Sequence, residues 1–159
     1  MIPVLAVPDP GQAKRMLHQV FGFTEAATGR MALGDQEIAL CDTGAMPAGL
    51  VELPFDHLAL SVTSADAALD GFSARGAELD ADFTPDDPVE IPEFWSNGVR
   101  FVFFRGPEGA PLEFCQKVGE ETGPGHSHYG LRTAALDETE AALTARGATR
   151  IAGNVLPGS

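Results

Sequence analysis

The sequence has few cysteines, few basic residues and no long apolar segment. Its two cysteines, Cys41 and Cys115, cannot form a disulfide framework, so we expect reduced thiols. Ten Lys and Arg residues against 23 Asp and Glu residues give a net charge of −13, which repels nucleic acid and anionic membrane surfaces. No apolar window is long enough for a transmembrane helix, and the segment from Met1 to Val7 is too short for a secretory signal. These absences predict a cytoplasmic protein that binds neither nucleic acid nor a membrane.

The sequence does contain a repeated strand and helix pattern. A short strand around His57 is followed by a helix over residues 64–75. The same order returns at His128, with a helix over residues 136–146. The spacing is 71 residues for the two histidines (128 − 57) and also for the two glycines that end the helices (147 − 76). A gapless repeat predicts two copies of one structural unit, each of which opens on a histidine.

We therefore expect one compact domain built from three modules. The chain has 159 residues, of which 44% are hydrophobic, so a sizeable core is available. Residues 1–43 have the order β-α-β-β-β, and residues 55–118 repeat it. Residues 126–159 form an incomplete third module that extends only to a second strand.

Glycine- and proline-rich segments indicate where the modules are joined. Segments 43–54 and 119–127 are rich in these residues and are interpreted as linkers. In the second module we expect a strand over residues 77–83 and then an irregular loop over residues 84–97. In the third module the second strand is expected near residues 149–155.

Two segments of the second module resemble a known family. The first strand, His57–Val62, and the segment Phe94–Cys115 with its Gly-Pro-Glu-Gly hairpin at residues 106–109 are similar to the vicinal-oxygen-chelate superfamily. This superfamily includes glyoxalases, extradiol dioxygenases, methylmalonyl-CoA epimerases and bleomycin- or fosfomycin-resistance proteins. The resemblance implies an α+β fold in which paired β-α-β-β-β modules form a curved, mostly antiparallel sheet. It also implies that the resulting cup holds a divalent metal ion.

The same resemblance implies metal ligands on the first and last strands of a module, which here are His57 and Glu113. The strand pattern agrees, since Glu113 alternates with the apolar Leu112 and Phe114 and an unpaired buried charge is costly. The alternative is that Glu113 lies on a solvated face. The first module offers Ile2 and Ala39 at these positions, and neither can bind a metal.

His128 is the candidate for a third ligand. Two imidazoles and one carboxylate make the facial triad that leaves coordination positions open, and extradiol dioxygenases of this superfamily use that combination. His128 could reach the site in its own chain or in a partner chain, and His126, two residues earlier on the same strand face, is the fallback. The alternative is that both histidines belong to a polar linker end and that the third module packs on the outside.

Four further residues are candidates for substrate binding. Arg100 could hold a carboxylate or phosphate, or it could neutralise the acidic segment over residues 82–93. Trp95 is expected to cover the mouth of the cup, with Asn97 beside it. Cys115 shares the face of Glu113, where a thiol could be a soft ligand, a redox-sensitive group or plain lining.

The resemblance, together with the candidate ligands, implies a metal-dependent, glyoxalase-like enzyme of the lyase or isomerase type. The substrate would be a small molecule that chelates the ion through two oxygens, with Glu113 doubling as a base. The ion could be zinc, nickel, manganese or iron. One alternative is an extradiol-type dioxygenase, and another is a non-catalytic, bleomycin-resistance-like protein whose charge of −13 suits a cationic drug. Strand edges left open by the incomplete module predict a homodimer.

Overall fold

The protein folds into two sheets and three α-helices in the part of the chain that is described. The computed structural model describes residues 2–46, 48 and 55–150. Its helices are α1 (Pro10–Gln19), α2 (Ala65–Ala74) and α3 (Leu136–Thr144), with a short 3₁₀ turn at Pro107–Gly109. The strands are β1 (Val4–Val7), β2 (Thr24–Ala27), β3 (Arg30–Leu33), β4 (Gln36–Asp42), β5 (Phe55–Ser61), β6 (Glu78–Leu79), β7 (Val89–Ile91), β8 (Val99–Arg105), β9 (Pro111–Lys117) and β10 (Gly125–Leu131).

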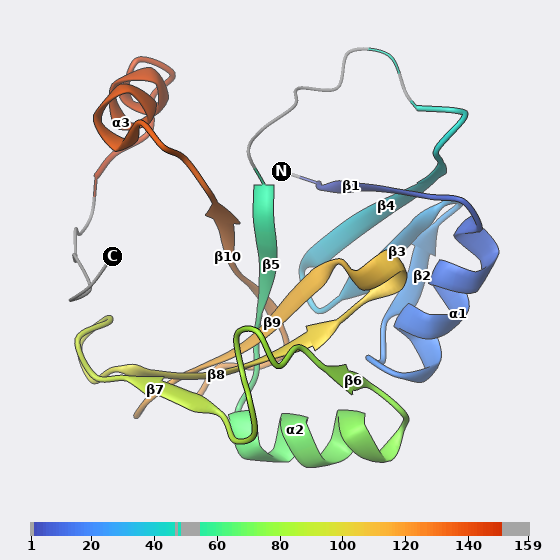
Figure 1. Cartoon of the computed structure of the whole chain (residues 1–159), viewed down its shortest axis with the longest axis horizontal. Coiled ribbons are helices and arrows are strands. Elements are labelled where there is room, and N and C mark those ends of the chain that lie inside the picture. Colours follow the sequence, from blue (N-terminus) through green and yellow to red (C-terminus); the bar gives the residue numbers. More distant parts are fainter. Residues whose placement is uncertain (1, 47, 49–54, 151–159) are drawn as a thin grey trace.

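The strands divide between a four-stranded sheet and a six-stranded sheet. The first has the order β1-β4-β3-β2, and the second has the order β10-β5-β9-β8-β6, with β7 also paired to β8 (Figure 1). Each sheet contains one parallel pair, β1 with β4 and β5 with β9, and its other pairs are antiparallel. The expected α+β class and the mostly antiparallel pairing are confirmed.

Local sequence signals explain where the helices start and stop. Asp9 accepts a hydrogen bond from the backbone of Gln12 at the start of α1, and Pro10 supplies the first helical residue. Ser64 accepts one from the backbone of Ala67 at the start of α2. Gly76 follows α2 with φ of +87°, a conformation that glycine adopts without strain.

The core is formed by helices α1 and α2, one face of the six-stranded sheet, and Met31 and Ile38 of the four-stranded sheet. Phe21, just after α1, stacks on Phe114 of β9 with ring centroids 5.6 Å apart. Phe72 of α2 approaches the same ring, at 4.4 Å between centroids. Leu58 and Leu60 of β5 join this cluster. Because side chains alternate along a strand, the residues between these apolar ones point to the opposite face of the sheet.

The first strands of the second and third modules lie side by side. β5 pairs antiparallel with β10, whereas the first module forms its own sheet. Helix α3 follows β10, contains no buried residue and stands apart from both sheets (Figure 1). None of the described helices is long and apolar enough to cross a membrane.

Three expected boundaries were wrong. The strand expected over residues 77–83 ends at Leu79, because the backbone turns at Asp80 and the Thr84 hydroxyl accepts the hydrogen bond from the Phe103 backbone. The loop expected over 84–97 contains strand β7. The linker expected over 119–127 already contains the start of β10. The strand expected near 149–155 and the linker at 43–54 lie mostly outside the described residues.

Candidate metal centre

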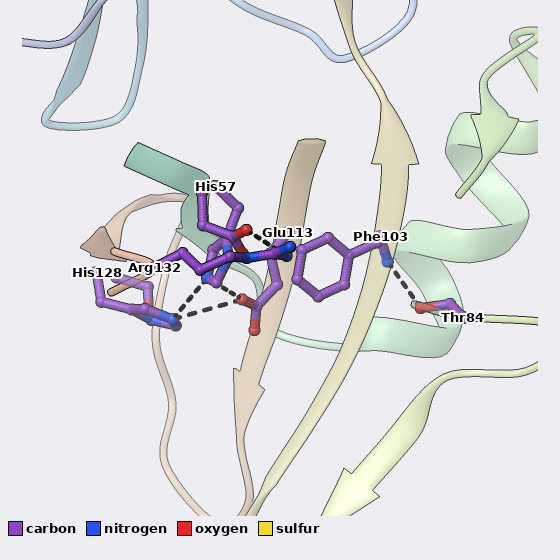
Figure 2. A network of polar contacts seen from close by, with 8 residues as sticks. His57, Thr84, Phe103, Glu113, His128 and Arg132 are labelled. Atoms are coloured by element: carbon purple, nitrogen blue, oxygen red, sulfur yellow. Dashed lines mark hydrogen bonds and ion pairs between the residues drawn. The ribbon is translucent and has the colours of Figure 1, made fainter. Parts of the chain in front are cut away.

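Three neighbouring strands bring His57, Glu113 and His128 together. His57 comes from β5, Glu113 from β9 and His128 from β10, and β5 lies between the other two strands. The His57 Nε2 atom lies 3.0 Å from Glu113 Oε2, and the His128 Nε2 atom lies 3.4 Å from it. The two Nε2 atoms are 3.3 Å apart. Figure 2 shows the three side chains converging from their strands.

These separations match the edges of a coordination polyhedron. Nitrogen or oxygen ligands about 2.1 Å from an ion are separated by about 3.0 Å at right angles and by about 3.4 Å at tetrahedral angles. The donor atoms of the three residues all lie within 4.8 Å of one another. The donor set therefore fits a divalent ion, with two imidazoles and one carboxylate as ligands.

The buried carboxylate of Glu113 stays ionised because of the two imidazoles. Glu113 is only 5% exposed, and burial alone would raise its pKa. Hydrogen bonds from His128 and His57 outweigh that effect and lower the pKa of Glu113 to about 2. Burial likewise disfavours the charged form of His57, but hydrogen bonds with Glu113 and Asp56 outweigh it, so the pKa of His57 is raised.

Asp56 fixes the orientation of the His57 ring. Its Oδ2 atom lies 2.9 Å from His57 Nδ1, and its Oδ1 atom lies 2.6 Å from Nη2 of Arg132. A hydrogen bond at Nδ1 directs the Nε2 atom of the same ring toward the centre, as carboxylates do for metal-binding histidines. The ring of Phe103 contacts His57 edge-on, with centroids 5.1 Å apart. Sequence reasoning gave Asp56 and Arg132 no role, although Asp56 directly precedes the histidine.

His126 lies outside this cluster. Strand β10 has a bulge at residue 127. His126 is opposite Leu60 and His128 is opposite the adjacent residue Ala59, so the residue between the two histidines has no partner of its own on β5. As a result His126 bonds through Nδ1 to Gln36 of the first module, at 2.7 Å. The alternation assumed from the sequence does not survive the bulge.

Two of the substrate-binding candidates lie near the centre and two do not. The Trp95 ring centroid is 6.1 Å from that of His128, and this side chain is 43% exposed. Cys115 is buried on the face of Glu113, and burial together with the charge of Glu113 raises its pKa to about 12. Arg100 is on the face of β8 that points away from the candidate centre, where it donates hydrogen bonds to both carboxylate oxygens of Asp66 in α2. Asn97 lies against Gly119, beyond the end of β9.

Comparison with known proteins identifies the fold. No protein-family model matches the chain, and no curated protein matches its sequence. Among solved structures, TioX from Micromonospora sp. ML1 matches with a TM-score of 0.53 at 24% identity, over 77% of this chain and 98% of that one. The chain has the vicinal-oxygen-chelate fold.

Two further structures support that assignment of the fold. A member of the glyoxalase/bleomycin resistance protein/dioxygenase superfamily from Sphaerobacter thermophilus matches with a TM-score of 0.52 at 17% identity, over 73% of this chain and 94% of that one. A point mutant of glyoxalase I from Zea mays matches with a TM-score of 0.52 at 13% identity, over 73% of this chain and 43% of that one. At these identities the vicinal-oxygen-chelate fold is shared, whereas the activity has to be argued from the site.

Proposed function

We propose that the protein is a metal-dependent enzyme whose divalent ion is held by His57, Glu113 and His128. The observation that carries the proposal is the convergence of three donor atoms at separations of 3.0, 3.3 and 3.4 Å. A bound ion would supply Lewis-acid chemistry and open positions for two neighbouring oxygens of a small substrate. The chain's own part is to orient His57 through Asp56 and to cover the centre with Phe103 and Trp95.

The low pKa of Glu113 bears on the class of reaction. A lyase or isomerase of the glyoxalase type needs a base near the substrate, and a good base has a pKa near the working pH. With a pKa lowered to about 2 by its imidazole partners in the metal-free protein, Glu113 is ionised and suited to be a ligand. Lyase or isomerase chemistry would require Glu113 to leave the ion before it could act as the base.

An extradiol-type dioxygenase makes no such demand on Glu113. Two histidines and one carboxylate with open positions are the ligand set of mononuclear non-haem iron oxygenases. This ligand set favours dioxygenase chemistry over the lyase or isomerase chemistry that the sequence pattern placed first. Iron or manganese would then be the functional ion.

Metal content combined with oxygen uptake tests the proposal. The purified protein is loaded with Zn²⁺, Ni²⁺, Mn²⁺ or Fe²⁺, freed of excess ion and analysed for metal. We expect one ion per chain, and oxygen uptake only with the iron or manganese form when catechol is supplied. Turnover of a hydroxy-ketone without oxygen would instead favour the isomerase. If the protein binds no metal but binds a cationic drug tightly, the enzyme hypothesis is wrong and the protein is a drug-binding protein.

We also propose a cytoplasmic homodimer. Strand β1 is at the edge of the four-stranded sheet, and its outer side has no partner among the described strands. Such an edge favours pairing with another chain. Leu136 of α3 is 67% exposed, which adds an apolar contact surface. Cys41 and Cys115 are both free thiols, which is consistent with a reducing compartment.

A further inference from the structure

The His57 ring occupies the space where a side chain on Gly130 would lie. Gly130 is directly opposite His57 in the antiparallel pair of β5 and β10. A β-carbon on Gly130 would lie 2.6 Å from His57 Nε2 and closer still to Cε1 and Nδ1 of the same ring. Non-bonded carbon contacts are optimal at about 3.5–4.0 Å, so any side chain at this position overlaps the ring.

The glycine is needed for space and not for backbone conformation. Eight glycines of the described chain have positive φ, and Gly130 is not among them. An alanine at this position would therefore keep an ordinary strand conformation. In a strand, alanine in place of glycine usually stabilises a protein by reducing the freedom of the unfolded chain. The three described atoms nearest to a β-carbon on Gly130 all belong to the His57 ring.

The 71-residue repeat gives Gly130 a counterpart in β5. Residue 59 corresponds to residue 130 (59 + 71), and Ala59 is directly opposite His128. Ala59 also lies opposite Glu113 on the other neighbouring strand, so its methyl group lies between the strands that carry Glu113 and His128. This methyl group is fully buried. Each histidine is thus followed two residues later by a small residue that lies opposite the other histidine.

We propose that Gly130 and Ala59 are positioning residues whose small size leaves room for the rings of His57 and His128; we call each of these spaces the seat of its histidine. The pattern histidine, any residue, small residue occurs once in β5 and once in β10. Because the two strands are antiparallel, the small residue of each strand lies opposite the histidine of the other. Side chains larger than these would push the imidazoles apart and open the 3.3 Å approach of their Nε2 atoms. The seats define the separation of the two imidazoles, and their functional meaning rests on the proposed metal centre.

A double-mutant cycle on metal-free protein tests the seat of His57. Gly130→Ala should lower the unfolding temperature when His57 is present. In a His57→Ala background the same change should leave that temperature unchanged or raise it, because no ring remains to be overlapped. In a His128→Ala background the loss should persist, since His57 is still there. Gly123→Ala is the matched control, because a β-carbon there meets no atom within 4 Å.

Metal titration supplies the functional readout. We expect Gly130→Ala to weaken Zn²⁺ binding at least tenfold, with Gly123→Ala unchanged. Ala59→Val should weaken it similarly, and its effect on unfolding should shrink in the His128→Ala background. If Gly130→Ala changes the unfolding temperature equally with and without His57, Gly130 does not position the His57 ring and the proposal is wrong. If the wild type binds none of the four ions, the proposed function fails, while the unfolding cycle still decides whether the seats exist.

Discussion

The Nε2 atoms of His57 and His128 lie 3.3 Å apart although 71 residues separate them in the chain. Both rings also direct Nε2 toward the same oxygen of Glu113, at 3.0 and 3.4 Å. Two neutral imidazoles gain little from facing each other in this way unless a proton or a cation lies between them and the carboxylate. We propose that this cation is a metal ion.

Removal of any one ligand should abolish stoichiometric metal binding. We expect His57→Ala, Glu113→Gln and His128→Ala each to weaken binding by more than the roughly 10–100-fold that loss of an outer-shell partner causes. His126→Ala is the matched control, since it alters a histidine on the same strand whose ring bonds to Gln36. Metal analysis and calorimetric titration measure the effect. Unchanged affinity in His128→Ala would remove that residue from the site.

Loss of the Asp56 carboxylate should weaken metal binding without removing a ligand. Asp56→Asn keeps the size of the side chain but loses the charge that holds Nδ1 of His57. We expect a loss of about 10–100-fold in metal affinity, measured by titration. Arg132→Gln should have a much smaller effect, because this arginine is 74% exposed and exposed ion pairs contribute little. An equal loss in both variants would mean that Asp56 acts through Arg132.

Metal affinity should rise with pH. The raised pKa of His57 means that the metal-free protein keeps a proton on this ring above the ordinary value of 6.5. Because a metal ion must displace that proton, binding should be weak at pH 6 and strengthen up to the raised pKa. Titration with Zn²⁺ from pH 5.5 to 8.5 measures this slope. A flat profile over that interval would contradict a protonated His57.

The free energy of unfolding of the metal-free protein should fall both when the pH becomes acidic and when it rises above neutral, for two different reasons. The pKa of Glu113 is lowered from 4.5 to about 2, so its contribution is present above pH 4.5 and is lost as the pH falls toward 2. The pKa of His57 is raised, so its contribution is present below 6.5 and is lost as the pH rises through the raised value. Urea unfolding should show that Glu113→Gln removes much of the acid-side dependence.

Cys115 should be unreactive in the native protein. Its pKa is raised to about 12 by burial and by the charge of Glu113, and the side chain is 1% exposed. Since alkylation requires the thiolate, iodoacetamide at pH 8 should modify the partly exposed Cys41 and leave Cys115 intact. Both should react in urea, which serves as the control. Rapid native labelling of Cys115 would support the redox or ligand role instead of plain lining.

The proposed dimer can be tested directly. Sedimentation at micromolar concentration should give twice the chain mass of 16.7 kDa. The outer edge of β1, which pairs with none of the described strands, is the contact we expect to be covered, because its backbone groups can pair with a second strand. Backbone hydrogen exchange should then be slow along β1. A species of only 16.7 kDa at all concentrations would contradict the dimer.

The sequence by itself determined the α+β class, and it predicted the repeated units and the three residues His57, Glu113 and His128 whose side chains meet in the structure. Strand alternation placed Glu113 opposite the apolar face, and the gapless 71-residue repeat placed His128 in register with His57. These inferences are possible because side-chain direction in a strand depends only on local geometry. Helix caps at Asp9 and Ser64 are local for the same reason.

The tertiary structure alone decided which strands become neighbours and which side chains meet. Pairing of β5 with β10 places His57 over Gly130, and the bulge at Ser127 turns His126 toward Gln36. Arg100 bonds to Asp66 because α2 packs across that face of the sheet. None of these contacts has a local signal, since each joins residues brought together by long-range packing and by departures from regular alternation.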